Sequence, residues 1–284
     1  MNILDELTHY RRPLPSPGLA GAIEKEAAAA CSKENLALCL SCMDYTSLEP
    51  TDTEASLSAK IAALREKLRR DSLPPAAAVC VFPRFAGAAR QALARSPIKT
   101  AVAGGGFPSA GTFARVKLLE YRCAIEAGAE EIDAVAPAGE ILEKRYQQVY
   151  DELALAREAC AGVTLKVIIE TGELRDLEAI FRATLVCAHA GADFVKTSTG
   201  KTPVSATPEA VLAMCEALRL FYIRTGRRVG VKVAGGIAAH ESAILYMTIV
   251  RRALGEEWLA PRHFRIGASR LLDDLAKRYK SLSR

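Results

Sequence analysis

Two lysines stand inside short apolar segments, where a charged side chain is unusual. Lys196 follows Phe194 and Val195, which are apolar and β-prone, and Lys232 lies between two valines. A lysine is rarely buried without a partner or a chemical task. Lys196 taken alone could equally be a charge in water on an edge strand, so the rest of the chain must decide between these interpretations.

Further ionisable residues occupy or follow other apolar segments of the same kind, namely Asp44, Asp133, Lys166 and Glu170. Lys166 and Glu170 have the same parity along an extended strand, so both should point to one side. Each residue could belong to a buried structural ion pair, and for Lys166 this is the favoured role. Two aspartates and three lysines converging on one site nevertheless exceed what packing requires.

Such a set supports amine catalysis. A lysine attacks a carbonyl only as the neutral amine, although its ordinary pKa is near 10.4. A second ammonium disfavours the charged form, since two unit charges about 4 Å apart repel by roughly 4 kcal/mol at an effective dielectric near 20. If Lys196 and Lys232 lie on adjacent strands, one can keep the other neutral, and an aspartate across the site can move protons to and from the substrate.

Glycine-rich turns follow three of the apolar segments and offer backbone N–H groups to an anion. They are Gly200-Lys201, Gly235-Gly236 and Gly267-Ala268-Ser269. In α/β barrels a phosphate often binds at the loops after the last strands. The residues therefore indicate a Schiff-base enzyme that acts on a small phosphorylated aldehyde or sugar.

Two glycine motifs resemble nucleotide-binding patterns but lack required residues. Thr199-Gly200-Lys201-Thr202 resembles the end of a P-loop, yet Val195 stands where that pattern needs its first glycine. The run from Gly104 to Gly106 lacks the last glycine of a dinucleotide fingerprint, because Ser109 takes that place. It is either a tight turn after a strand or a place where backbone approaches a ligand.

The elements that must position these residues alternate regularly between strand and helix. Strands are predicted at residues 36–45, 76–82, 99–103, 131–136, 164–170, 192–196, 228–233 and 263–266. Helices are predicted at about residues 52–70, 85–95, 111–127, 140–160, 173–189, 207–224 and 239–254, with one more closing the chain. Eight such units predict an α/β fold of the (β/α)₈ TIM-barrel type. An open doubly wound sheet is the alternative, but its glycine fingerprint after the first strand is absent.

The chain is expected to form one catalytic domain, residues 36–284, preceded by an N-terminal extension, residues 1–35. Residues 1–17 end in a proline-rich run that predicts a stiff, extended leader on the surface. Residues 19–34 predict a short alanine-rich helix, which either closes the bottom of the barrel or is loosely held.

Composition excludes several classes of protein. The net charge of +5 is spread along the chain and is not typical of a nucleic-acid interface. The acidic start is not typical of a signal peptide, and no apolar run reaches the roughly 18 residues of a membrane helix. Eight cysteines inside predicted elements indicate a reduced, cytoplasmic protein. Cys39-x-x-Cys42 lies along a predicted strand and has no second pair, so no metal site is expected.

Several long segments resemble 2-deoxy-D-ribose-5-phosphate aldolase, a family of class I aldolases. The most specific are residues 165–174, 191–201 and 231–237, which carry Lys166, Lys196 and Lys232. Residues 80–85, 128–133 and 264–269 match as well, and the resemblance extends over roughly residues 40–272. It implies a barrel without metal or other cofactor, which reversibly cleaves 2-deoxy-D-ribose 5-phosphate into D-glyceraldehyde 3-phosphate and acetaldehyde in deoxyribonucleotide catabolism. It also implies a homodimer, with no nucleic-acid or membrane partner.

The resemblance assigns roles to individual residues. It implies that Lys196 forms the Schiff base, that Lys232 tunes it and joins proton transfer, and that Asp133 is the proton shuttle. It places Asp44 near a substrate hydroxyl and the glycine turns around the phosphate. The resulting substrate-binding set is Asp44, Lys166, Thr199, Gly200, Lys201, Gly235, Gly236 and Ser269.

The sequence departs from the family pattern at three places. Arg270 follows Ser269 where a second serine is common, and it could strengthen phosphate binding or narrow the pocket. The residues after Asp133 are smaller than in many members, so other aldehydes could be accepted. The last tyrosine is Tyr279, so a tyrosine tail that reaches the site is not expected.

Two alternative functions remain compatible with the sequence. A related Schiff-base aldolase or transaldolase for another sugar phosphate would keep Lys196 and differ in pocket residues such as Ala136 and Arg270. A sugar-phosphate binder without catalysis belongs to another class, and the combination of Lys196, Lys232 and Asp133 argues against it because binding alone needs no neutral amine.

Overall fold

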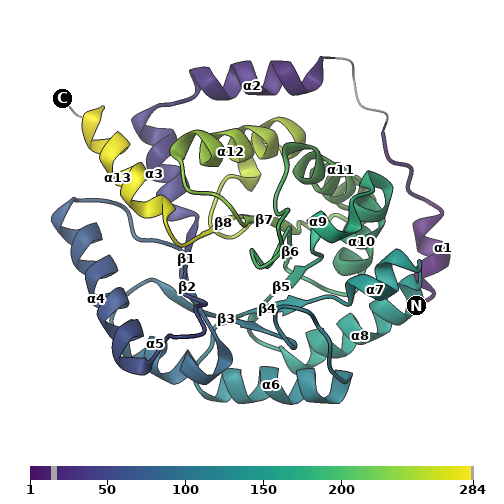
Figure 1. Ribbon diagram of the computed structural model, residues 1–284. Coiled ribbons are helices and arrows are strands. Elements are labelled where there is room, and N and C mark those ends of the chain that lie inside the picture. Colours follow the sequence, from purple (N-terminus) through teal and green to yellow (C-terminus); the bar gives the residue numbers. More distant parts are fainter. Residues whose placement is uncertain (14–17, 283–284) are drawn as a thin grey trace.

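The computed structural model describes residues 1–13 and 18–282, and its centre is a closed barrel of parallel strands in the order β1 to β8 (Figure 1). The strands are β1 (Met43–Thr46), β2 (Ala78–Val81), β3 (Lys99–Gly104), β4 (Glu131–Val135), β5 (Thr164–Ile168), β6 (Phe194–Lys196), β7 (Gly230–Ala234) and β8 (Phe264–Ala268). β1 pairs with β8 and closes the ring, so the predicted TIM barrel is confirmed and the open sheet is excluded.

Helices surround the barrel on its outside (Figure 1). Those that follow the strands are α4 (Glu54–Arg70), α5 (Ala86–Ala92), α6 (Ala114–Glu126), α7 (Ala138–Leu142), α8 (Tyr146–Ala159), α9 (Thr171–Leu174), α10 (Leu177–His189), α11 (Pro208–Thr225), α12 (His240–Leu254) and α13 (Leu271–Ser281). Two short 3₁₀ turns are also present: η1 (Pro83–Phe85) follows β2, and η2 (Glu256–Trp258) precedes β8.

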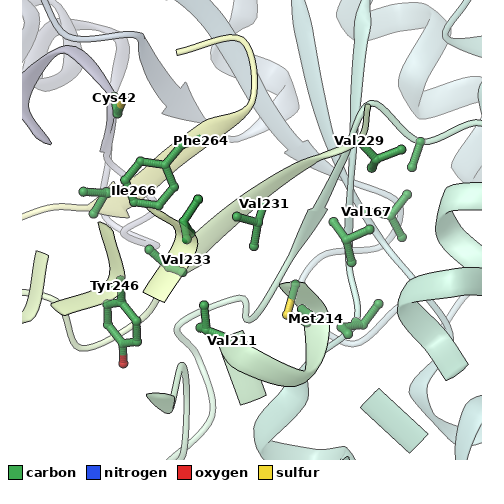
Figure 2. Close-up of a cluster of buried hydrophobic side chains, with 14 of the residues drawn as sticks. Cys42, Val167, Val211, Met214, Val229, Val231, Val233, Tyr246, Phe264 and Ile266 are labelled. Atoms are coloured by element: carbon green, nitrogen blue, oxygen red, sulfur yellow. The ribbon is translucent and has the colours of Figure 1, made fainter. Parts of the chain in front are cut away.

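The main hydrophobic core fills the space between the strands and the helices. Figure 2 shows outward-facing side chains of β7 and β8, such as Val231 and Phe264, packed near Val211 and Met214 of α11. Alternation along each parallel strand then directs the intervening residues into the barrel. On β7 this places Lys232, between Val231 and Val233, inside the barrel.

Local signals determine where the helices begin. The Thr207 side chain accepts a hydrogen bond from the backbone N–H of Ala210, and Pro208 occupies the first turn of α11, as its sequence predicts. Two long predicted helices are interrupted. Residues 140–160 form α7 and α8, with Lys144 in the left-handed region between them, and residues 173–189 form α9 and α10 around the left-handed Arg175.

The strand predicted at residues 36–45 is wrong over its first half. α3 (Lys33–Ser41) occupies it, and β1 begins only at Met43. The Ser32 side chain caps α3 by accepting from the backbone N–H of Asn35, and the buried positions Leu36, Cys39 and Leu40 follow helical spacing. A run of apolar residues cannot by itself distinguish a buried strand from a buried helix.

The N-terminal residues pack on the outside of the helical ring. α1 (Ile3–Leu7) contacts α8 and α10 and buries Ile3 and Leu7, so the predicted extended leader is wrong there. Residues 14–17, the end of that predicted leader, lie outside the described residues. α2 (Leu19–Ala29) packs along α12, where Arg252 pairs with Glu26 at 2.9 Å, and it does not cross the bottom of the barrel (Figure 1).

The Cys39-x-x-Cys42 motif lies in the core, and its predicted place along a strand is wrong for Cys39. Cys39 belongs to α3, its Sγ is 3.9 Å from Sδ of Met247, and Cys42 precedes β1. Burial raises the pKa of the Cys42 thiol to about 12. All eight cysteines of the chain are free thiols. Within the described residues, no helix is both long and apolar enough to cross a membrane.

Candidate active site

Seven ionisable side chains are buried inside the barrel and contact one another, and we refer to them as the buried charge network. Its members are Asp44 of β1, Glu131 and Asp133 of β4, Lys166 of β5, Lys196 of β6, Lys232 of β7 and Arg265 of β8. The structure therefore brings together Asp44, Asp133 and the three lysines, as the sequence predicted. Parallel strands of a closed barrel make this possible, because their inward residues share one small interior.

Asp133 is the centre of the network and contacts all three lysines. Its Oδ2 accepts hydrogen bonds from Nζ of Lys196 and from Nζ of Lys232, both at 2.7 Å. Its Oδ1 accepts from Nζ of Lys166 at 2.9 Å. Since each Nζ is 2.7 Å from the same oxygen, the amines of Lys196 and Lys232 are at most twice that distance apart.

Asp44 connects the network to its far end. Its Oδ2 accepts from Nζ of Lys232 at 2.5 Å and lies 3.5 Å from Nζ of Lys166, while its Oδ1 accepts from Arg265 at 2.6 Å. Arg265 also donates two hydrogen bonds to Glu131, at 2.8 and 3.0 Å, and Glu131 lies 2.5 Å from Nζ of Lys166. Every carboxylate therefore contacts at least two cations.

The pairing determines the charge of these groups. Burial alone would raise the pKa of Asp133, but Lys166, Lys196 and Lys232 outweigh burial and hold that pKa well below its usual range. Burial would lower the pKa of Lys232, and Asp133 and Asp44 raise it instead. Lys232 is therefore an ammonium close to Lys196. It is the second positive charge that the sequence analysis proposed beside the nucleophilic lysine.

A cavity of about 170 Å³ opens at the C-terminal ends of the strands, above the network. It is lined by Thr46, Leu48, Glu49, Lys196, Thr199, Gly200, Lys201, Ala234, Gly235, Gly236, Ile237, Gly267, Ala268, Ser269 and Arg270. Most of the predicted binding residues are on this lining. Asp44 and Lys166 are not, and they lie below it within the network. Of the three lysines on Asp133, only Lys196 lines the cavity.

The glycine turns shape one wall of the cavity. Gly200, Gly235 and Gly236 all have positive φ, of 78°, 90° and 74°. A Cβ on Gly235 would be 2.3 Å from Oγ of Ser205, whereas one on Gly236 would meet nothing within 4 Å. Gly235 therefore permits close contact between the loops after β6 and β7, and Gly236 leaves space on the open side.

Glu170 holds the loop that follows Lys196. Its carboxylate accepts from the backbone N–H of Thr199 at 3.2 Å and from Oγ1 of Thr199 at 2.5 Å. Glu170 itself adopts a left-handed backbone conformation two residues after β5. Lys201 extends across the cavity rim and donates from Nζ to the carbonyl of Leu48 at 2.7 Å. Thr199 therefore anchors the loop after β6 to Glu170.

Sequence reasoning missed two members of the network, Glu131 and Arg265. Both have a recognisable signal: Glu131 shares parity with Asp133 on β4, and Arg265 interrupts an apolar strand between Phe264 and Ile266. It also missed Cys80 of β2, whose Sγ is 3.9 Å from Oδ2 of Asp133. Burial raises the pKa of the Cys80 thiol to about 11, so it is neutral near pH 7.

A possible metal-ligand group occurs elsewhere. Among the described residues, His240, Glu241 and Asp274 can bring three ligand atoms within 4.8 Å of one another. Oδ2 of Asp274 already accepts from the backbone N–H of His240 at 2.7 Å and lies 2.7 Å from its Nδ1. These contacts join the starts of α12 and α13, and the cluster does not belong to the lining of the cavity.

The closed barrel, with its lysines buried around one aspartate below a glycine-lined cavity, is the arrangement of an α/β-barrel enzyme. The family model described as DeoC/LacD family aldolase matches residues 38–277. The chain therefore belongs to the DeoC/LacD family of aldolases.

Named relatives and solved structures agree with this membership. The chain is 39% identical over 246 residues to the deoxyribose-phosphate aldolase of Mus musculus and 37% identical over 246 residues to that of Homo sapiens. Each match covers 83% of this chain and 77% of the relative. The tetrameric deoxyribose phosphate aldolase of Aeropyrum pernix superposes with a TM-score of 0.68 at 26% identity, covering 94% of this chain and 100% of that one.

Proposed function

We propose that this aldolase reversibly cleaves 2-deoxy-D-ribose 5-phosphate into D-glyceraldehyde 3-phosphate and acetaldehyde through a Schiff base on Lys196. One observation carries the assignment: of the three lysines held by Asp133, Lys196 alone reaches the cavity. Lys166 and Lys232 are enclosed by carboxylates, so neither amine is available to a carbonyl carbon. The named relatives support the same substrate.

The bond changes follow from this arrangement. The neutral amine of Lys196 adds to the aldehyde carbon, C1, and loss of water from the carbinolamine leaves an iminium ion. The C3 hydroxyl then loses its proton, the C2–C3 bond breaks, and its electron pair passes into the iminium to form an enamine. Glyceraldehyde 3-phosphate leaves, C2 gains a proton, and hydrolysis releases acetaldehyde and the free amine.

Asp133 is proposed to move these protons. Its Oδ2 lies 2.7 Å from Nζ of Lys196, within the distance that proton transfer requires. Lys232 shares that oxygen, and its positive charge favours a neutral amine on Lys196 before attack. In this proposal Asp44 and Lys166 lie below the cavity and do not contact the substrate. Asp44 holds Lys232 in position, and Lys166 holds Asp133. Direct contact of either with the substrate hydroxyl would require them to leave these partners.

The phosphate is proposed to bind at the glycine turns. Gly200, Gly235, Gly236 and Ser269 line the cavity next to Lys201, and backbone N–H groups together with a cation are a common phosphate site. Arg270 lines the same cavity and adds a second cation. We also propose that the chain works in the cytoplasm, which its free thiols support, and as a homodimer.

Reductive trapping tests the Schiff base. The protein is treated with acetaldehyde and sodium cyanoborohydride, and its peptides are mapped by mass spectrometry. An adduct on Lys196, absent from the Lys196→Leu variant, is expected. The absence of an adduct, or an adduct on another lysine in its place, would contradict the proposal.

Substrate comparison separates this function from its alternatives. Lys196→Leu should abolish turnover while thermal unfolding remains cooperative. Faster turnover of another sugar phosphate than of 2-deoxy-D-ribose 5-phosphate would favour the related aldolase or transaldolase. Tight binding of the sugar phosphate without turnover would favour a binding protein.

A further inference from the structure

The buried charge network is not electrically balanced when all its members are ionised. It holds three carboxylates, on Asp44, Glu131 and Asp133, and four cations, on Lys166, Lys196, Lys232 and Arg265. One positive charge therefore remains in an interior where uncompensated charge is expensive. Loss of a single proton from one lysine would leave three negative and three positive charges.

The contacts indicate which lysine can lose that proton. Lys166 lies near three carboxylates, and Lys232 and Arg265 each lie near two. Lys196 contacts one, that of Asp133. Lys196 is also the member that lines the substrate cavity. The least compensated cation and the proposed nucleophile are therefore the same residue.

Arg265 and Glu131 set this excess charge from the opposite end of the barrel. Their bidentate contact lies beside a second cavity of about 530 Å³, which they line together with Ser41, Pro75, Pro97 and Arg262. Neither residue lines the substrate cavity. Their charges reach Lys196 through Asp44, Lys166 and Asp133, within an interior that screens charge weakly.

We propose that Arg265 and Glu131 are positioning residues that fix the charge of the network at one excess positive charge, so that Lys196 is the amine released as a neutral nucleophile. This inference deepens the proposed function and rests on it. Arg265 supplies the extra cation that makes a neutral Lys196 favourable. Glu131 limits the excess to a single charge and keeps Lys166 and Arg265 protonated.

The groups that face Lys196 come from nearly every strand. Within the network they are Asp133 and Glu131 of β4, Lys232 of β7, Asp44 of β1, Lys166 of β5 and Arg265 of β8, with the neutral thiol of Cys80 on β2. At the cavity they are Glu49, Lys201 and Arg270, which line it, and Glu170, which holds Thr199. β3 contributes Ala101 and Ala103.

Opposite single changes should move the reaction in opposite directions along the pH scale. Arg265→Gln removes the excess charge, so the acid limb of the kcat/KM profile should move to higher pH, by an amount on the order of 1 on the pH scale. Glu131→Gln adds an excess charge and should move that limb to lower pH by a similar amount. The double variant restores the original excess, and its limb should return close to the unmodified position.

Trapping on Lys196 with acetaldehyde and cyanoborohydride is measured across the same pH range in each variant. Arg122→Gln and Glu126→Gln, both exposed on α6, change charge by the same amounts away from the network and should leave the profile unchanged. If Lys196 of the unmodified protein forms no adduct, the proposed function fails. If the adduct forms but the single variants move the limb in the same direction, or not at all, the charge-balance inference fails alone.

Folding is followed by thermal unfolding in each variant. If Arg265→Gln does not fold, Glu131→Gln and the double variant still decide the matter, because a structural role predicts that the double variant is the more damaged. A double variant whose profile is displaced further than that of Glu131→Gln would overturn the proposal.

Discussion

Strands β2 and β3 line the barrel interior with Ala78, Cys80, Ala101 and Ala103, a small apolar cluster covered by Leu48, Phe82 and Phe107. On the other strands the same interior is lined by the buried charge network. Small apolar side chains need no partners, whereas each group on the charged side depends on the others. One half of the interior is therefore stabilised by packing alone, and the other half by mutual compensation of charge.

The largest effect is expected in the charged half, when the carboxylate that the three lysines share is removed. Asp133→Asn keeps the shape but leaves the ammoniums of Lys166, Lys196 and Lys232 without their common carboxylate. We expect kcat/KM to fall by about 10²–10⁴-fold and the free energy of unfolding by about 3–5 kcal/mol. Steady-state kinetics and urea unfolding measure both, and retention of more than a tenth of the activity would refute the role of Asp133 as proton shuttle.

The charged half should also give the protein its pH-dependent stability. Asp44 and Asp133 have a lowered pKa in the fold, because the surrounding cations outweigh burial. Their contribution is present above the unfolded pKa of about 3.9 and is lost as the pH falls below it. Lys166 and Lys232 have a raised pKa, since their carboxylates outweigh burial. Their contribution is present below about pH 10 and is lost at higher pH.

Urea unfolding between pH 2 and 11 is the measurement. A plateau from about pH 4 to 10 with losses on both sides is expected. A group whose pKa differs by 1 between the folded and the unfolded protein changes the free energy of unfolding by about 1.4 kcal/mol. A steady change of stability across the plateau would show that other groups dominate.

The smallest effect is expected on the apolar half. Cys80→Ala removes a neutral thiol near Asp133, so stability should fall by less than about 1.5 kcal/mol and turnover by less than tenfold. Exposed Cys123→Ala is the matched control for loss of a thiol. A loss of turnover as large as that of Asp133→Asn would mean that the division between the two halves does not hold.

The barrel and the central part of the site could be predicted because their signals are local. The regular alternation of elements predicts the fold. A lysine between two valines, as at Lys232, can be recognised from the sequence of one strand alone. Arg265 and Glu131 could not be linked to the site, because Arg265 of β8 meets Glu131 of β4 across the interior only once the barrel is closed. The helix at residues 33–41 was missed because Leu36 to Cys42 has a composition that both elements allow.

The cluster on β2 and β3 limits the direction in which the volume of the barrel interior can change. Ala78, Ala101 and Ala103 are already nearly as small as side chains can be, so substitution at these positions mostly makes the interior narrower. Widening it would fall to Phe82 and Phe107, whose rings meet edge to face with centroids 6.0 Å apart at the border of the cluster. Larger residues at the alanines would therefore fill the interior, truncation of the two phenylalanines would open it, and neither change would alter a residue of the buried charge network.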